Sequence, residues 1–298
     1  MNGLISPTIV VTDSGLGGLT VLAQLENKLS STGSFKEPKL VYFNAVYEHE
    51  IGYNQLKSQE EKLHVFNSAL EAMRTKFNPD TILIACNTLS VIYNETKFAK
   101  NNPPKVSGIV NQGVNQSYNR LFLDDESAVI IMGTPTTINS HAHKNMLVKK
   151  GIAEHRIIEQ PCYYLESEIQ INSECEKVHS IISDFIDEAA KNISSHIKKL
   201  FILLACTHYE YALPAFNKVL NKKFETFEIL NPNEAMAQNI IVNQSKKKFV
   251  TNSEVEVHSR VDITEDELKT LGTYIKSKST KTYDAIKNYT WDRNLFNI

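Results

Sequence analysis

Two short apolar segments of similar composition constrain the fold of this chain more than any other feature. Residues 81–85 read Thr-Ile-Leu-Ile-Ala and precede Cys86, while residues 200–205 read Leu-Phe-Ile-Leu-Leu-Ala and precede Cys206. Each run has the length and composition of a fully buried strand, and each stops at a cysteine that is followed by a helix. The two cysteines lie 120 positions apart. This repeat predicts two related halves, each of which contributes one cysteine to a shared site.

The same offset separates a second pair of predicted strands. Residues 9–13 and 129–133 are apolar segments that both run into polar loops. Strands that alternate with helices along a chain predict parallel sheets with helices on both faces. In such sheets ligands bind beyond the carboxyl ends of the strands, which is where Asp13, Thr134 and the two cysteines fall. We therefore expect an α/β fold of two pseudo-symmetric lobes, each a mostly parallel sheet flanked by helices, with an active site in the cleft between them.

The lobe boundaries and the elements follow from this pattern. We expect residues 1–112 and about 235–298 to form the N-terminal lobe and residues 113–234 the C-terminal lobe, with a crossing point at 111–113. Residues 276–298 are predicted to be a peripheral tail. Strands are predicted over residues 8–11, 39–43, 81–85, 106–110, 128–132, 156–159, 200–205 and 227–230. Helices are predicted over residues 16–28, 55–77, 89–99, 174–199 with a break, 213–221, 233–242 and 263–275, and one further helix is predicted from the loop after 133 through about 149.

Composition limits the classes of partner. The chain is 42% hydrophobic and 22% charged, which is ordinary for a soluble globular protein, and its formal net charge of −2 gives no field that would attract nucleic acid or an anionic membrane. Neither a secretory signal nor an apolar run near the ~18 residues of a transmembrane helix is visible. Four cysteines are too few for a disulfide scaffold. We therefore expect a cytoplasmic protein with reduced thiols.

A glycine-rich loop, Asp13-Ser-Gly-Leu-Gly-Gly-Leu-Thr20, joins the first strand to the first helix. Such a loop can hold an anion with the backbone N–H groups at the start of a helix. It is a poor match to the dinucleotide fingerprint, because Thr20 stands where the third glycine belongs. The alternative is that Gly15, Gly17 and Gly18 simply permit a tight turn.

The two cysteines have surroundings that suit chemistry. A lone buried cysteine usually behaves as a small hydrophobic residue. Here, however, both thiols lie where a strand gives way to a helix, a position that favours the thiolate, and polar residues follow each one. These polar residues are Asn87, Thr88, Thr207 and His208.

Two thiols on opposite sides of a small ligand suit one reaction well. One thiolate removes a proton from carbon and the other thiol returns a proton to the opposite face, which inverts the carbon without a cofactor. Each thiol needs a neighbour that manages its proton, because general acid–base work requires a pKa near the operating pH. His208 is two residues from Cys206, and Asp13 lies in the same half as Cys86.

Four motifs resemble, in order and spacing, those of glutamate racemase and the cofactor-independent aspartate/glutamate racemases. They are Asp13-Ser-Gly-Leu-Gly-Gly-Leu-Thr20, Ala85-Cys-Asn-Thr88, Gly133-Thr-x-x-Thr-Ile-x-Ser140 and Ala205-Cys-Thr-His-Tyr209. The resemblance covers roughly residues 8–245. It implies an amino-acid racemase that uses no pyridoxal phosphate, metal or nucleotide, acts on a small amino acid in the supply of peptidoglycan precursors, and assembles as a homodimer.

The resemblance also implies roles for individual residues. Cys86 and Cys206 would be the acid/base thiols, with Asp13 assisting the first and His208 the second, and Glu166 is the candidate for a further assisting carboxylate. The α-amino and α-carboxylate groups would be held by Ser14, Asn87, Thr88 and Thr207, and the distal carboxylate would lie near Thr134 and Thr137.

The sequence departs from the family pattern in the loop after Tyr42-Phe43. Where the family carries an aspartate and then Pro-Tyr-Gly, this chain has Ala45, Glu50, Ile51 and Gly52. A carboxylate at position 50 repels a bound carboxylate unless it points away, in which case the Ile51 and Gly52 amides could still hold the distal group. The segment 254–298 is also longer than the family leads us to expect.

Three other functions remain open. Cys206 and His208 could bind zinc together with His141 and His143, although residues two apart in a helix do not share a face. Cys206 and His208 could instead serve a cysteine hydrolase, which leaves the matched Cys86 without a role. A family member without amino-acid activity could bind a protein partner, as the altered loop and long C-terminal segment would allow.

Overall fold

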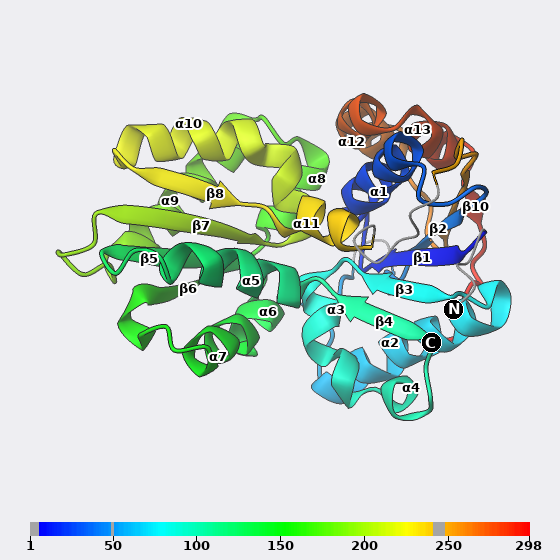
Figure 1. Ribbon diagram of the computed structural model, residues 1–298, viewed down its shortest axis with the longest axis horizontal. Coiled ribbons are helices and arrows are strands. Elements are labelled where there is room, and N and C mark those ends of the chain that lie inside the picture. The colour runs from blue at the N-terminus through cyan, green and yellow to red at the C-terminus, as the bar shows by residue number, and fades with distance from the viewer. Residues whose placement is uncertain (1–5, 49–50, 241–247) are drawn as a thin grey trace. The chain divides into compact units, whose positions relative to one another are not determined.

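The computed structural model describes residues 6–48, 51–240 and 248–298, and within them the chain divides into two compact units. The first unit comprises Met1–Gly108 and Asn233–Ile298, and the second comprises Ile109–Pro232. Figure 1 shows the two units coloured along the chain. Each unit contains its own sheet and its own helices, so each is described by itself.

The sheet of the first unit has the strand order β10-β9-β2-β1-β3-β4, and all neighbouring strands are parallel. The central strands β1, β2 and β3 are apolar and almost entirely buried, as expected where helices cover both faces. The strands are β1 Thr8–Asp13, β2 Lys39–Asn44, β3 Thr81–Ile84, β4 Lys105–Gly108, β9 Glu254–Ser259 and β10 Thr290–Trp291.

The helices of the first unit lie on both faces of this sheet. Helices α1, α12 and α13 pack together on one face, and α2 and α4 lie on the other (Figure 1). Polar side chains cap the N-termini of several of these helices. Ser58 accepts a hydrogen bond from the Glu61 amide at the start of α2, and Thr264 forms a capping box with Glu267 at the start of α12. The helices are α1 Leu19–Thr32, α2 Gln59–Phe77, α3 Asn87–Ile92, α4 Lys97–Lys100, α11 Pro232–Asn239, α12 Glu265–Lys278 and α13 Thr280–Lys287.

The second unit is a four-stranded parallel sheet in the order β6-β5-β7-β8. Helices α9 and α10 pack side by side on one face, and α5 and α7 lie on the other (Figure 1). The elements are α5 Val110–Leu121, β5 Ser127–Gly133, α6 Pro135–Asn139, α7 Ala142–Lys149, β6 Ile157–Pro161, α8 Leu165–Ile171, α9 Glu176–Ala190, β7 Lys199–Ala205, α10 Leu213–Lys223 and β8 Phe227–Leu230.

The two sheets repeat one strand order. In the first unit β2-β1-β3-β4 are neighbours, and in the second β6-β5-β7-β8 are neighbours, so each strand of one set has a counterpart four strands later. The segments that carry Cys86 and Cys206 follow the counterparts β3 and β7. The predicted α/β fold with two parallel sheets flanked by helices is therefore confirmed, and the 120-residue repeat reflects a repeated strand order.

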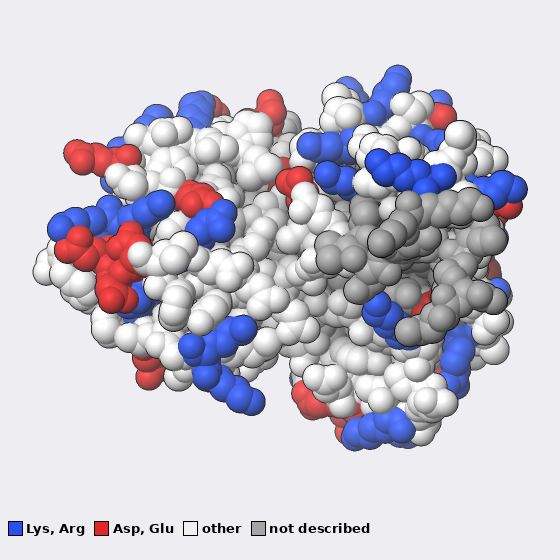
Figure 2. Space-filling view, in the orientation of Figure 1, with Lys and Arg blue, Asp and Glu red and all other residues white. Residues whose placement is uncertain are grey.

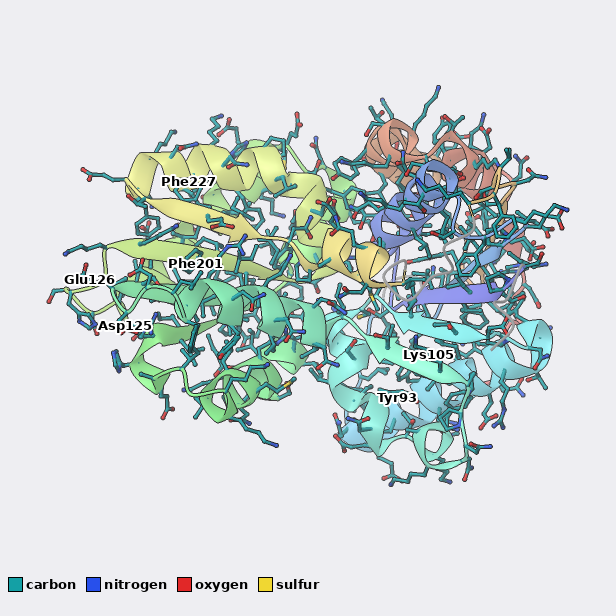
Figure 3. All side chains as sticks on the ribbon, viewed as in Figure 1. Tyr93, Lys105, Asp125, Glu126, Phe201 and Phe227 are labelled. Atoms are coloured by element: carbon teal, nitrogen blue, oxygen red, sulfur yellow. The ribbon has the colours of Figure 1, made fainter. Side chains whose placement is uncertain are left out.

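A polar network occupies the amino end of the second sheet. Arg156 is 5% exposed and donates hydrogen bonds to the carbonyl oxygens of Ser127 (2.7 Å) and Leu121 (2.8 Å). It also pairs with Asp125 at 3.1 Å, while Glu126 pairs with Lys198 at 2.7 Å. Figure 3 labels Asp125 and Glu126 at this end of the sheet. The charged groups here satisfy the chain's own backbone, which leaves the carboxyl end of the sheet as the place for a ligand.

Two of the predicted helices are interrupted. The helix expected over residues 89–99 is α3, a 3₁₀ turn and then α4, because Thr96 adopts an extended conformation and its side chain caps α4. The helix expected to run through about 149 is broken between α6 and α7, where His141 has a positive φ of 53°. The predicted crossing point at 111–113 lies inside α5, which was not predicted, and neither was α8.

The prediction of a peripheral tail over residues 276–298 is wrong. Helix α13 packs on α1, β10 pairs with β9, and Leu295 and Phe296 are 1% and 4% exposed in the core that also contains Cys86. Strand β9 itself was missed and pairs along its whole length with β2. Its sequence Glu-Val-Glu-Val-His-Ser alternates polar and apolar residues, which is the period of a half-buried strand near a sheet edge.

Two surface features bear on partners. Figure 2 shows charged side chains of both signs over the visible face, with lysines and arginines gathered over α12 and α13. Across residues 6–48, 51–240 and 248–298, we find no helix with the length and apolar character needed to cross a membrane. The helix predicted over 233–242 is α11, and its predicted last residues from 241 lie outside the described residues.

Candidate functional site

The residues predicted to be functional gather at the carboxyl ends of the strands in each unit. In the first unit β1 ends at Asp13, and the Ala85 amide, just before Cys86, donates to the Thr12 carbonyl at 2.9 Å. In the second unit Gly133 ends β5 opposite Ala205 at the end of β7, so Thr134 and Cys206 follow from adjacent strands. Each unit therefore carries one half-site, built around one thiol.

The Cys86 half-site contains a buried thiol beside a hydroxyl and a carboxyl group. Cys86 is 5% exposed, and its Sγ lies 3.1 Å from Ser14 Oγ. Burial, together with the charge of the neighbouring Asp13, raises the pKa of the Cys86 thiol to about 12, while the Ser14 hydroxyl and the backbone N–H groups of Leu89 and Ser14 act in the opposite direction. The thiolate formed here is accordingly a strong base with hydrogen-bond donors in place.

Asp13 is held in this half-site by close packing of the glycine-rich loop. Asp13 is 1% exposed, and a Cβ placed on Gly18 would lie 2.8 Å from Asp13 Cβ and 2.9 Å from Asp13 Oδ2. Gly15, Gly17 and Gly18 are absent from the positive-φ residues of the described chain, so the glycine at position 18 serves close approach rather than a left-handed turn. The Tyr42 hydroxyl donates to the Gly15 carbonyl at 2.6 Å and fixes the same loop.

Asn87 has a buried side chain that the described protein leaves unpaired. It is 3% exposed, and neither its Nδ2 nor its Oδ1 atom has a hydrogen-bond partner within the described residues. A buried amide with both ends unpaired is unusual in a folded protein. The neighbouring Thr88 is equally buried at 3%. A small molecule with donor and acceptor groups, such as the α-amino and α-carboxylate groups of an amino acid, would satisfy Asn87.

The altered loop after β2 is only partly described. Ala45 is fully buried, and its amide donates to the Asp13 carbonyl at 2.8 Å, which ties the loop to the half-site. His49 and Glu50 lie outside the described residues. The Ile51 amide donates to the Glu48 carbonyl at 3.3 Å, and the Gly52 carbonyl accepts from Gln55 at 3.0 Å. The Ile51 amide is thus engaged within the loop itself.

The Cys206 half-site pairs a thiol with a neutral histidine. Cys206 is 8% exposed, and its Sγ lies 4.0 Å from His208 Nδ1. Burial lowers the pKa of His208 to about 4, so the ring is neutral at physiological pH. His208 Nε2 lies 2.8 Å from Gln170 Oε1, an acceptor, which places the ring proton on Nε2 and leaves Nδ1 as an acceptor toward Cys206.

Gln170 is a residue of this half-site that the sequence did not reveal. It lies on α8, an element absent from the predicted set, and its role depends on a contact across 38 positions of the chain. The only local signal is its spacing, since Gln170 stands four residues after Glu166 and therefore shares a helix face with it.

Glu166 is placed on α8 near a buried phenol. Its Oε2 atom is buried without a hydrogen-bond partner in the described chain, and burial raises the pKa of its carboxyl. The pKa of the fully buried Tyr209 is raised by burial and then by the charges of Cys162, Cys206 and Glu166. Glu166 and Cys206 therefore both lie within electrostatic reach of Tyr209.

The threonines of the second unit line the same edge of the sheet. Thr134 and Thr137 are 4% and 1% exposed, and their Oγ1 atoms lie 3.1 Å apart. Thr207 is 2% exposed and directly follows Cys206. All three threonines are therefore buried where β5 and β7 end.

Two of the residues considered as zinc ligands, His141 and His143, have environments that do not suit a metal site. His141 caps α7 and its Nδ1 lies 2.7 Å from Glu159 Oε2, whereas His143 is 2% exposed within α7. Within the ranges that the structure describes, no group of three or more His, Cys, Asp or Glu side chains has a spacing that could hold a metal ion.

No family model matches the chain. Among curated proteins it is similar to the glutamate racemases of Aquifex pyrophilus (24% identity over 229 residues, 77% of this chain and 80% of that protein) and Campylobacter jejuni (26% over 264 residues, 83% and 93%). The glutamate racemase of Clostridium perfringens is 27% identical over 247 residues, 79% of this chain and 85% of that protein. The similarity to each of these proteins runs through most of the chain.

Solved structures show the same fold. Glutamate racemase from Francisella tularensis in complex with D-glutamate has a TM-score of 0.68 at 21% identity, covering 92% of this chain and 95% of that one. Glutamate racemase from Aquifex pyrophilus has a TM-score of 0.64 at 20% identity, covering 90% and 94%. The resemblance to the glutamate racemases that the four motifs predicted is therefore confirmed, in sequence over 77–83% of the chain and in fold.

Proposed function

We propose that this chain is an amino-acid racemase of the glutamate racemase class that works without a cofactor, using Cys86 and Cys206 as its two acid/base groups. The observation that carries the proposal is the matched placement of the thiols. Each follows the third strand of a repeated order, each is buried, and each has its own polar neighbour. The curated relatives with this sequence pattern are glutamate racemases.

The chemistry requires one thiolate and one thiol on opposite faces of the α-carbon. The thiolate takes the α-proton, the electron pair of the C–H bond moves into the α-carboxylate, and the second thiol gives its proton to the other face. The carbon is inverted, the first cysteine now holds the former α-proton as a thiol, and the second cysteine is left as a thiolate. The reverse reaction begins from the complementary protonation state, so each thiol is the base for one enantiomer.

The two half-sites manage the proton by different means. At Cys86 burial and Asp13 raise the thiol pKa, so the thiolate, once formed, has a large driving force for taking a proton from carbon. At Cys206 the neutral His208 presents an acceptor nitrogen to the thiol, and Gln170 fixes its tautomer. Glu166 supports this half-site as a further carboxyl group whose raised pKa favours its protonated form.

Glutamate is the substrate that the relatives support best. Ser14, Asn87, Thr88 and Thr207 hold the α-amino and α-carboxylate groups, and Thr134 and Thr137 donate to the distal carboxylate. One of the solved relatives was crystallised with D-glutamate. In line with that class, the protein works in the cytoplasm as a homodimer and supplies a D-amino acid for peptidoglycan precursors.

An exchange screen in D₂O tests the function. The protein is incubated with each amino acid in D₂O, and loss of the α-proton signal is followed by NMR together with optical rotation. Glutamate should lose its α-proton while it racemises, because each inversion delivers a solvent-derived proton. Exchange with no amino acid would overturn the racemase proposal and favour a binding protein, whereas formation of a thioester with an ester substrate would indicate a cysteine hydrolase.

The His208→Asn variant tests the Cys206 half-site. It should lower kcat by about tenfold to a hundredfold, the size of a supporting contribution to proton transfer. The loss should fall mainly on one direction of racemisation, and KM should fall with kcat in that direction. This follows because two enantiomers have equal free energy, so kcat/KM must stay equal in both directions.

The pH profile of this variant separates a chemical role from a structural one. The His208 ring gains a proton only as the pH falls to about 4. Between pH 5 and 9 the mutation should therefore lower kcat by the same factor at every pH, without shifting the pH values at which kcat begins to fall. The alkaline limb should lie above pH 10, because the pKa of Cys86 is about 12. The matched control is His143→Asn, which also replaces a buried histidine of this unit. Equal small losses of kcat in both directions would show that His208 is only structural.

A further inference from the structure

Arg260 is a half-buried residue whose guanidinium group is partly unpaired within the described residues. It directly follows β9, and its guanidinium carbon lies 4.9 Å from the centroid of the Phe296 ring. Its Nε and Nη1 atoms are buried and have no hydrogen-bond partner within the described residues. A guanidinium stays charged in a protein, and leaving its buried N–H groups unpaired costs free energy. An anionic ligand would remove that cost.

A cavity lies beside Arg260. Its volume is about 380 Å³, and its lining includes Tyr47, Glu48, Asp262, Trp291 and Arg293. Two of the charged groups are already engaged, since Asp262 accepts from the Tyr289 hydroxyl at 2.7 Å and the Arg293 guanidinium lies over Trp291 at 5.4 Å. The exposed Glu48 acts on Arg260 through its charge, yet within the described chain no ion pair joins the two. What sets Arg260 apart in this cavity is that two of its guanidinium nitrogen atoms are buried without a hydrogen-bond partner within the described residues.

Tyr53 is a buried tyrosine that interacts electrostatically with both Cys86 and Arg260. Tyr53 is 1% exposed, and its hydroxyl is buried without a hydrogen-bond partner in the described part of the first unit. It belongs to the same buried cluster as Cys86 and Phe296. Burial raises the pKa of Tyr53, and the charge of Cys86 acts in the same direction while that of Arg260 opposes it. The Tyr53 hydroxyl therefore lies within electrostatic reach of both the thiol and the guanidinium.

The strand order fixes how far apart these groups can be. The carboxyl ends of β3, β1, β2 and β9 follow one another along the same edge of the sheet. Three steps of about 4.8 Å between strands separate the end of β3 from the end of β9 by roughly 14 Å. The long side chain of Arg260 and the side chain of a dicarboxylic amino acid, reaching toward each other, can together cover this span.

We propose that Arg260 binds the terminal anionic group of the substrate side chain, with the Tyr53 hydroxyl as a further donor beside those already named, and thereby selects dicarboxylic amino acids. The inference rests on the proposed racemase function, with the substrate α-carbon at Cys86. It assigns the specificity contact to the C-terminal segment 254–298. In this chain a cation from β9 takes over anion recognition from the loop after β2, whose Ile51 amide is engaged with Glu48.

The test compares glutamate with glutamine, which differs only in the charge and hydrogen bonding of its distal group. In the Arg260→Gln variant, kcat/KM for glutamate should fall tenfold to a hundredfold, the loss expected for a charge-assisted hydrogen bond, while any activity on glutamine is retained. Arg260→Lys keeps the charge without the planar fork and should fall between wild type and Arg260→Gln. The matched control is Arg74→Gln, because Arg74 also lies over a phenylalanine ring (5.2 Å from Phe98) in the same unit and should leave kcat/KM unchanged.

The outcomes separate this inference from the function on which it rests. Wild-type exchange on no amino acid overturns the racemase proposal and the role of Arg260 together. Wild-type activity on glutamate with an unchanged kcat/KM in Arg260→Gln overturns only the role of Arg260. Wild-type preference for neutral or basic amino acids does the same. If Arg260→Gln does not fold, Arg260→Lys decides, since a folded Lys variant with full activity on glutamate contradicts a role for the guanidinium of Arg260.

Discussion

Replacing either Cys86 or Cys206 by serine should lower the rate of racemisation at least about a thousandfold in both directions, because every inversion uses both thiols. Serine is close to cysteine in size, so the packing of each half-site should survive. Its hydroxyl is far less acidic than a thiol, however, and neither supplies a usable base nor returns a proton efficiently. The rate is measured by optical rotation from each pure enantiomer.

Hydrogen exchange gives the same variants a sharper readout. The thiol that remains can still remove the α-proton of one enantiomer and return a deuteron to the same face. Cys86→Ser and Cys206→Ser should therefore each exchange one enantiomer without racemising it, and the two variants should act on opposite enantiomers. The control is Cys175→Ser, because Cys175 is a half-exposed thiol at the start of α9 and is not one of the two acid/base thiols. Full racemisation by either half-site variant would exclude the two-base mechanism.

Much of the fold was predictable because a fully buried strand can be recognised from its local sequence. The apolar runs before Cys86 and Cys206 have the composition that a parallel sheet imposes when helices cover both faces, and both are strands in the structure. The same holds for Phe227–Leu230, where the predicted and observed bounds agree. The approach of Ser14 to Cys86 also follows from the strand pattern, because adjacent parallel strands bring their carboxyl ends to one edge of the sheet.

The missed features depend on contacts between distant parts of the chain. The link between Gln170 and His208 crosses 38 positions, and nothing near Gln170 in the sequence marks it. The interruption at His141 depends on a positive φ at a residue other than glycine, which periodicity does not register. Strand β9 was not predicted because its sequence contains more polar than apolar residues. In the structure it pairs with β2, and Val257 is only 2% exposed.

The Phe296→Ala variant measures how firmly the C-terminal segment belongs to the first unit. Phe296 is 4% exposed, and its ring centroid lies 5.8 Å from that of Phe43 in the core cluster that includes Cys86. Truncating a buried phenylalanine removes its transfer free energy and leaves a cavity, so the free energy of unfolding should fall by about 3–5 kcal/mol. The loss is measured from the urea midpoint of the unfolding transition. Trp291→Ala is the comparison, since Trp291 is 51% exposed and its truncation should lower the free energy of unfolding clearly less than that of Phe296.

A second substitution at Phe296 tests substrate specificity as well as stability, because the Phe296 ring also lies against the Arg260 guanidinium. Phe296→Leu keeps most of the apolar volume but removes the ring face on which the guanidinium lies. It should therefore cost less stability than Phe296→Ala, yet still lower kcat/KM for glutamate, because Arg260 loses the surface that holds its planar group. If the segment were a peripheral tail, Phe296→Ala and Trp291→Ala would have equally small effects on unfolding. A large stability loss in Phe296→Ala with unchanged glutamate activity in folded Phe296→Leu would instead confine the segment to a structural role.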